Sequence, residues 1–219
     1  MNVYSLNQLE LTKKDDYRKV EYFCSNRNNH YEFPDVIYLL PNLTALSLHT
    51  NHLSKIPELI FLVPRIEHLD LSYNNFVDFP KEILVLTKLT YLDLSHNKIG
   101  IIPDFISELK NLKKLYLDNT NIETLPLSIC DLKHLSYVYL RHNRIQILPE
   151  LPSSCKDIDI THNELIDITI EPREMIFINK YGREIVEEKG LTYYLYEEKR
   201  IEQMSIIKRS TVKSARFIC

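Results

Sequence analysis

The sequence predicts an α/β solenoid in which short parallel strands line a concave face. Short helices, 3₁₀ turns or extended segments are expected on the convex side. The first observation behind this fold class is a frame of apolar residues that recurs every 23 residues, starting at Leu43, Ile66, Leu89, Leu112 and Leu135. The second is that Asn or Thr, and then Pro, return at the same offsets without an insertion or gap. A periodic unit of this length predicts stacked copies that share one continuous core.

The first half of each copy predicts a strand and a turn. Its two central apolar residues are two positions apart, so they lie on one face of a short strand. The residue between them is then expected to point to the opposite face, into solvent. Asn follows because its side chain can bond backbone groups in a turn. The column of this residue contains one departure, a Thr whose hydroxyl can satisfy fewer groups than an amide: Asn51, Asn74, Asn97, Thr120 and Asn143.

The second half of each copy predicts the return segment. It begins at a Pro, which fixes φ where no ladder N–H is needed. Apolar residues such as Ile83 and Leu86 then follow at three-residue spacing, which favours a 3₁₀ turn or short helix. The copy that starts at Leu135 is shorter and ends in LPELPSS, residues 148–154. Its two Pro favour an extended return segment before the next copy starts at Cys155.

The repeat frame divides the chain into three parts. Residues 1–42 are interpreted as an N-terminal cap with a degenerate first repeat from residue 20, in which Ser25 and His30 occupy positions expected to be apolar. Residues 43–170 form the repeats. Residues 171–219 are interpreted as a C-terminal cap followed by a basic tail.

The C-terminal part leaves the repeat pattern. Residues 175–178 and 191–196 have the β-propensity of strands, and residues 179–182 offer a turn. The spacing of apolar residues in 197–208 predicts an amphipathic helix. These elements would cover the open end of the last repeat.

The frame LxxLxLxxNxLxx[IFL]Pxx[IL]xxL resembles the leucine-rich repeat. The 23-residue copies resemble intracellular repeats of the Ras-suppressor and Scribble type. The LPELPSS stretch resembles the 20-residue repeats of bacterial secreted effector ubiquitin ligases, although the segment after Ile170 is too short for their catalytic domain with its Cys nucleophile. The resemblance covers about residues 20–170, and it implies a leucine-rich-repeat solenoid that recognises proteins without catalysis.

Composition narrows the class of partner. The net charge of −3 and the sequence pI of about 6.2 argue against a general nucleic-acid binder. The sequence shows no run of about 18 apolar residues and no signal peptide, so no membrane association is expected. The four Cys are scattered without a CxxC pair, which favours reduced thiols in the cytoplasm. We expect a monomer with a protein partner, acting as a scaffold or signalling regulator.

The outward strand positions and the residues that follow the strands predict a partner-binding patch on the concave face. It is rich in Tyr, His and Asp, and Tyr provides a large contact area with a polar tip at little entropic cost. The candidate residues are His68, Asp70, Tyr73, Tyr91, Asp93, His96, Tyr116, Tyr137, Tyr139, Arg141 and His142.

Two other functions are open at this stage. His142 and His162 share a column on adjacent copies with Asp159 nearby, and zinc accepts such ligands. Alternatively, residues 171–219 could bind a second protein, as in a regulatory inhibitor or substrate adaptor. No phosphate-binding loop and no nucleophile–base motif is present in the sequence. We therefore expect neither a cofactor, nor a bound metal, nor enzymatic activity.

Overall fold

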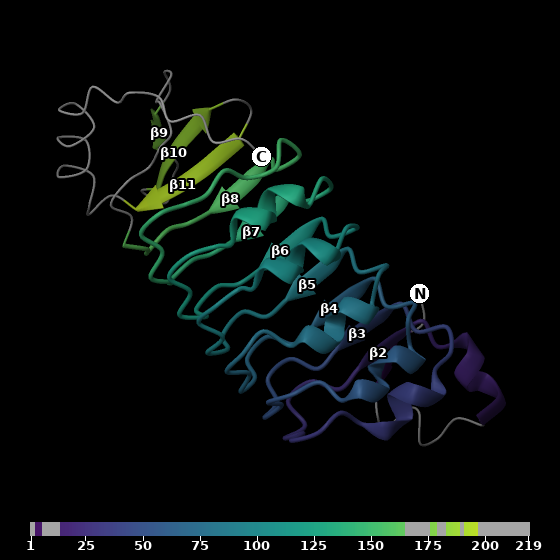
Figure 1. Cartoon of the computed structure of the whole chain (residues 1–219). Coiled ribbons are helices and arrows are strands. Elements are labelled where there is room, and N and C mark those ends of the chain that lie inside the picture. The colour runs from purple at the N-terminus through teal and green to yellow at the C-terminus, as the bar shows by residue number, and fades with distance from the viewer. Residues whose placement is uncertain (1–2, 6–13, 165–175, 179–182, 189–190, 197–219) are drawn as a thin grey trace.

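The computed structural model describes residues 3–5, 14–164, 176–178, 183–188 and 191–196. Its described strands form one eleven-stranded sheet in the order β1-β2-β3-β4-β5-β6-β7-β8-β11-β10-β9. Pairing is parallel from β1 to β8 and between β8 and β11, and antiparallel among β11, β10 and β9. The predicted solenoid with a parallel sheet is thereby confirmed (Figure 1).

The repeat strands are three residues long, and the C-terminal strands β10 and β11 are longer. The strands are β1 (Val3–Ser5), β2 (Tyr22–Cys24), β3 (Ala45–Ser47), β4 (His68–Asp70), β5 (Tyr91–Asp93), β6 (Lys114–Tyr116), β7 (Tyr137–Tyr139), β8 (Asp157–Asp159), β9 (Ile176–Ile178), β10 (Arg183–Glu188) and β11 (Leu191–Tyr196). Strands were expected at 175–178 and 191–196, and β9 and β11 confirm them. The helix expected at 197–208 lies outside the described residues.

The return segments from residue 34 to residue 132 are 3₁₀ helices, each preceded by a Pro in extended conformation. These helices are η2 (Asp35–Leu39), η3 (Glu58–Leu62), η4 (Lys81–Val85), η5 (Asp104–Glu108) and η6 (Leu127–Asp131), and another 3₁₀ helix, η1 (Lys14–Lys19), precedes the first repeat. Helices η2–η6 form the layer in front of the strands in Figure 1. Residues 140–156 return from β7 to β8 without a helix, as the two Pro of LPELPSS predict. We call the sheet side opposite η2–η6 the concave face.

The core lies between the sheet and the 3₁₀ helices. The central residues of the repeat strands are in register across the sheet and fully buried: Leu46, Leu69, Leu92, Leu115, Val138 and Ile158. Each return segment adds an Ile that is also buried, as Ile83 and Ile106 show. The sequence frame and the core therefore have the same register.

The Asn column forms a ladder that ties neighbouring copies together. Asn74 Nδ2 donates to Leu48 O and Leu71 O, both at 3.0 Å, and its Oδ1 accepts from Leu53 N at 3.0 Å. One buried amide thus satisfies backbone groups in its own copy and in the preceding one. The other Asn side chains of the column make the corresponding bonds: Asn51, Asn97, Asn143 and Asn163.

The ladder changes at Thr120, as the sequence predicts. Its Oγ1 donates to Leu117 O at 2.7 Å, and its backbone carbonyl accepts from Gly100 N at 2.9 Å. Gly100 has φ +71°, and Asn119 and Asn121 on either side of Thr120 also have positive φ. Where Thr120 replaces the Asn of the column, the loop after β5 therefore has a backbone conformation that differs from that of the other repeats.

The degenerate first repeat replaces two apolar positions by a hydrogen-bonded pair. Ser25 is only 1% exposed, and its Oγ lies 2.7 Å from His30 Nε2 and accepts from Asn28 Nδ2 at 2.9 Å. Backbone bonds also join this copy to the next, including Ser25 N to Ser47 O. Burial lowers the pKa of His30, which favours the neutral imidazole in its hydrogen bond with Ser25.

Leu92→Asp tests the register. Leu92 is fully buried in β5, with repeats on both sides. The substitution buries a carboxylate without a partner, so we expect a loss of about 3–5 kcal/mol in the free energy of unfolding, measured by thermal denaturation. The control is Lys98→Asp, an exposed position shortly after the same strand. Equal melting temperatures for the two variants would contradict the register.

Gly100→Ala tests the altered loop. A Cβ at Gly100 would meet nothing within 4 Å, so its cost is only that of holding φ at +71°. We expect a loss of about 1 kcal/mol for Ala in urea denaturation, and a smaller loss for Gly100→Asn because Asn tolerates this conformation better. Ile101→Ala is the matched control, since Ile101 is 76% exposed in the same loop. An Ala variant as stable as the wild type would rule out this account.

Candidate partner-binding site on the concave face

Two adjacent columns of side chains make up the centre of the concave face. The strand pairing aligns His68, Tyr91, Lys114 and Tyr137 in one column, and Asp70, Asp93, Tyr116 and Tyr139 in the other. The columns are separated by the buried Leu or Val at the centre of each strand, because successive side chains of a strand point to opposite faces. All seven strand candidates from the sequence therefore lie together on β4–β7. The other four candidates, Tyr73, His96, Arg141 and His142, follow these strands.

The aromatic rings of four consecutive strands form one continuous stack. The centroids of His68 and Tyr91 are 3.7 Å apart, with the ring planes 9° from parallel. Tyr91 contacts Tyr116 across the two columns at 5.0 Å, with the planes tilted by 36°. Tyr116 and Tyr139 then stack at 4.6 Å and 6°. We call these four residues the ring stack.

A lysine accompanies the ring stack. Lys114 Nζ lies 5.1 Å from the centroid of the Tyr137 ring, in the geometry of a cation–π contact. Lys114 is exposed, whereas Tyr137 is half-buried. The sequence indicates the column that holds Lys114, but not this pairing, because it depends on the side-chain direction of two neighbouring strands.

Aspartates on this face stabilise the turns that follow the strands. Asp70 Oδ1 accepts from Ser72 N at 3.0 Å, and Asp93 Oδ1 accepts from Ser95 N at 2.9 Å. These are Asx turns, which explain why Asp-Leu-Ser recurs in the frame. Asp118 was not among the candidates from the sequence, yet its Oδ1 accepts from Arg141 N at 2.7 Å in the next repeat.

Some outward positions are more covered than the sequence indicates. Ser47 and Asp159 were expected to point into solvent, but they are only 3% and 4% exposed. Ser47 Oγ donates to Asn26 Oδ1 and Asp70 Oδ2, and Arg141 Nε lies 3.7 Å from Asp159 Oδ2. Neighbouring side chains on the same face therefore cover these two positions.

Burial and mutual repulsion raise the pKa values of several carboxyl groups. The pKa of Asp93 rises to about 6, mainly because burial disfavours its charged form, and its hydrogen bonds from Ser95 oppose part of that rise. Asp70 and Asp118 raise it further by repulsion. The pKa values of Asp118 and Asp157 are also raised, again chiefly by burial. Burial lowers the pKa of His68, which favours the neutral form of its ring.

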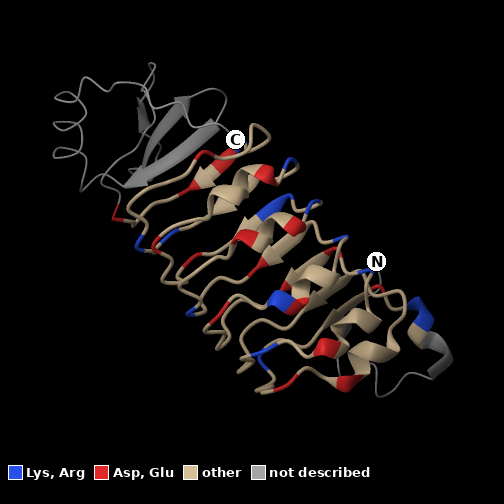
Figure 2. Cartoon of the chain, viewed as in Figure 1, with Lys and Arg blue, Asp and Glu red and all other residues tan. Residues whose placement is uncertain are grey.

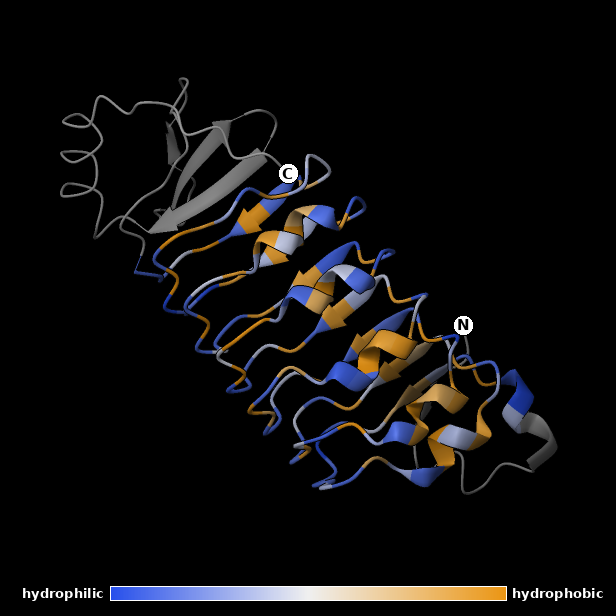
Figure 3. Ribbon diagram, viewed as in Figure 1, coloured by the Kyte–Doolittle hydropathy of each residue, from blue (hydrophilic) through white to orange (hydrophobic). Residues whose placement is uncertain are grey.

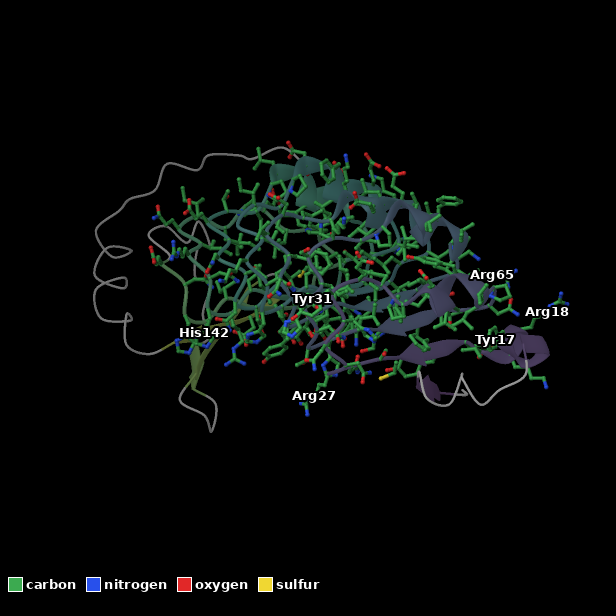
Figure 4. The ribbon with its side chains drawn as sticks, turned by 90° about the horizontal axis from the view of Figure 1, so that it is seen from below. Tyr17, Arg18, Arg27, Tyr31, Arg65 and His142 are labelled. Carbon is green, nitrogen blue, oxygen red and sulfur yellow. The ribbon has the colours of Figure 1, made fainter. Side chains whose placement is uncertain are left out.

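The residues before the Asn column form an edge of the concave face with left-handed backbone. Their φ values are positive at every repeat: Arg27, Thr50, Tyr73, His96, Asn119, His142 and His162. The rings of Tyr73 and His96 stack at 3.8 Å, and those of His142 and His162 at 4.0 Å. Figure 4 shows Arg27 and His142 on this sheet side, away from the helices. The Asn and His residues in this column indicate the left-handed backbone already in the sequence, because both tolerate positive φ better than most residues.

The His142–His162 pair has the geometry of a stack. The two ring planes are 8° from parallel, and the lone pair of an imidazole nitrogen lies in its own ring plane. Nitrogen atoms of stacked rings therefore do not converge on one point between the rings. Within the described residues, no group of three or more His, Cys, Asp or Glu side chains has an arrangement that could hold a metal ion.

Comparisons with known proteins bear on the fold. Two family models, "Leucine rich repeat" and "Leucine Rich repeats (2 copies)", match residues 41–99 and 87–129. The chain contains leucine-rich repeats. The solved structure of a leucine-rich-repeat protein from Leptospira interrogans is similar over 72% of this chain and 47% of that chain, with a TM-score of 0.61 and 23% identity. A search of curated proteins gives no match.

The similarity to known proteins identifies the fold of this chain. The chain spans less than half of the Leptospira protein, and the likeness between the two shows the fold, a leucine-rich-repeat solenoid. The finer resemblances, to Ras-suppressor and Scribble repeats and to effector ligases, stay predictions. In the described part of the chain, no helix is long and apolar enough to cross a membrane.

Asp93→Asn tests the electrostatics of the site. Because the pKa of Asp93 is about 6 when folded and about 3.9 in an unfolded chain, its ionisation destabilises the fold above pH 6. Asn keeps an oxygen for Ser95 N without the charge. We expect the variant to be more stable than the wild type by about 1–3 kcal/mol at pH 7.5. The difference should shrink as the pH falls from about 6 and vanish near pH 3, where Asp93 is protonated in both states.

The measurement is chemical denaturation at pH values from 3 to 7.5, and the comparison between variants cancels the histidine contributions that both proteins share. Glu58→Gln, at an exposed position in η3, is the control and should give no such pH-dependent difference. A stability difference for Asp93→Asn that is constant with pH would show that the carboxylate is not the cause.

Proposed function

We propose that this chain is a non-catalytic module that binds a protein partner on its concave face. The observation that carries the proposal is the ring stack of His68, Tyr91, Tyr116 and Tyr139 on four adjacent strands. Aromatic side chains dominate the binding energy of many protein interfaces, and Tyr combines a large apolar area with a hydroxyl. The backbone beneath the stack is fixed by parallel pairing and by the Asn ladder.

A prearranged surface of this kind favours binding. The rings already contact one another, so little side-chain entropy is lost when a partner covers them. The half-buried state of Tyr91, Tyr116 and Tyr139 leaves part of each ring for a partner. Leucine-rich repeats generally mediate contacts between proteins, which agrees with this use of the face.

The other attributes of the module are part of the same proposal. Among the described residues, Cys24, Cys130 and Cys155 have free thiols. A cytoplasmic location, a monomeric state and a role in scaffolding or signalling are predictions from the sequence. The alternative role for residues 171–219, as a second binding element of an adaptor, is also a prediction.

The test replaces Tyr91, Tyr116 and Tyr139 together with Ala. None of the three is a core residue, so the far-UV circular dichroism should stay unchanged and the melting temperature should fall by only a few degrees, through lost ring contacts. Partner affinity should fall by at least about 2 kcal/mol, or roughly 30-fold. The measurement is affinity capture from an extract of the source cells, followed by titration of the captured protein.

The matched control changes three apolar residues on the opposite side of the molecule, Leu59, Phe61 and Leu62, all of which are exposed on η3. Figure 3 shows orange, apolar segments among the 3₁₀ helices near the N-terminal end of the solenoid. The control variant should bind the partner as the wild type does. If it loses the partner while the tyrosine variant keeps it, the concave face is not the binding surface. Loss of capture only on removal of 197–219 would favour the adaptor role instead.

A further inference from the structure

We propose that the concave face recognises an extended, arginine- or lysine-bearing segment of its protein partner. A cationic head group would lie beside Asp70 and Asp93, and its aliphatic stem would cross the rings of Tyr91 and Tyr116. This inference rests on the proposed function, which it makes specific by naming the chemistry of the partner. It is carried by the position of two carboxylates next to the ring stack.

The carboxylates and the rings occupy neighbouring register positions. Asp70 pairs with Asp93 across β4 and β5, and Asp93 pairs with Tyr116 across β5 and β6. Adjacent parallel strands are about 4.8 Å apart, so one guanidinium can reach both carboxylates. Tyr91 lies on the same strand as Asp93 and contacts Tyr116 diagonally at 5.0 Å. The long apolar stem of Arg or Lys fits across such ring edges while its charged end reaches the acids.

The charge on this part of the face is unbalanced. Among the described residues, no salt bridge to Asp70 or Asp93 is present, and the nearby bases Arg141 and Lys114 contact other groups. Arg141 lies 3.7 Å from Asp159, and Lys114 lies over Tyr137. Figure 2 shows the Asp and Glu residues of the solenoid in red and its Lys and Arg residues in blue. A cationic side chain from outside would therefore complement the acids around the ring stack.

The hydrogen bonds of the fold use only part of the capacity of these carboxylates. Asp70 accepts from Ser72 N and Ser72 Oγ through Oδ1 and from Ser47 Oγ through Oδ2, and Asp93 accepts from Ser95 N through Oδ1. An ionised carboxylate can accept about four hydrogen bonds, so Asp93 has the larger remaining capacity. A purely apolar partner would bury the remaining charge without compensation, which is costly, and an acidic partner would be repelled. The pKa of Asp93 is raised chiefly by burial and further by repulsion from Asp70 and Asp118, and a nearby cation would relieve that repulsion.

The protein already holds one cation on an aromatic ring of this face. Lys114 Nζ lies over the ring of Tyr137, one strand away from Tyr116 and Tyr139. The surface thus accommodates a solvated amine at a tyrosine without a change in the strand register. The position beside Asp70 and Asp93 offers the same ring chemistry with two carboxylates added.

The probe is a fluorescein-labelled octapeptide of alternating Arg and Gly, titrated with the full chain and followed by fluorescence anisotropy at low salt. Its matched partner has citrulline in place of Arg, which keeps the shape and removes the charge. We expect the Arg peptide to bind at least about tenfold more tightly than the citrulline peptide. Failure of the Arg peptide to bind, or equal binding of the two peptides, would overturn the inference.

Two double variants separate this site from general charge attraction. Asp70→Asn with Asp93→Asn keeps the oxygens for the turns and removes two charges, so peptide affinity should fall about tenfold. Asp35→Asn with Glu58→Gln removes two exposed charges from η2 and η3 on the helix side, and should change affinity less than about twofold. Equal losses in both variants would mean that the peptide responds only to net charge, which would refute a site.

The same Asp double variant, used in the capture experiment, distinguishes the two proposals. If both the tyrosine variant and the Asp variant lose the captured partner, partner recognition depends on a cation at this site. If only the tyrosine variant loses it, the proposed function stands and the cationic partner is wrong. If neither variant loses it, the concave face is not used and both proposals fail.

Discussion

The hydrogen bonding of the buried Asn side chains is the constraint on which the rest of the fold depends. Each amide satisfies backbone groups of two successive copies, as Asn97 does by donating to Leu71 O and Leu94 O and accepting from Phe76 N. The strands are only three residues long, so their own pairing supplies few hydrogen bonds per copy. A buried amide at a fixed offset therefore keeps the strands in register, and the register sets the two columns of the concave face.

Much of this arrangement is predictable from the sequence because the repeat imposes it locally. The spacing of Leu, Asn and Pro predicted the strands, the turns and the 3₁₀ returns, and the column positions of Tyr91, Tyr116 and Tyr139 followed directly. What the frame does not contain is the direction of each side chain relative to the next repeat. The diagonal contact of Tyr91 with Tyr116, and the burial of Ser47 by Asn26 and Asp70, arise between copies. Such contacts depend on rotamers, which a one-dimensional pattern does not carry.

The departures from the repeat frame in the first repeat leave its strand pairing unchanged. Ser25 and His30 replace two apolar residues, yet they hydrogen-bond to each other, so the first repeat keeps its strand and its pairing with β3.

The residues before the Asn column have positive φ values in every repeat. These values are shared by residues as different as Thr50 and Tyr73, so the turn imposes this conformation on whichever residue occupies the position. The cost of such backbone is offset by the hydrogen bonds that the turn makes possible.

The interruption at Thr120 has a consequence for how the solenoid unfolds. In a linear array, each interface between neighbours contributes its own free energy, and the array separates first where that coupling is weakest. Between the copies that start at Leu89 and Leu112, the Asn-mediated bonds are missing, and a backbone bond from Gly100 N to Thr120 O and a bond from Asp118 N to Ser95 Oγ are present instead. This seam lies between β5 and β6 and divides the stack into two blocks. Amide exchange in β6–β8 should be uncoupled from exchange in β2–β5, so that a partner spanning β5 and β6 would join two cooperative units into one.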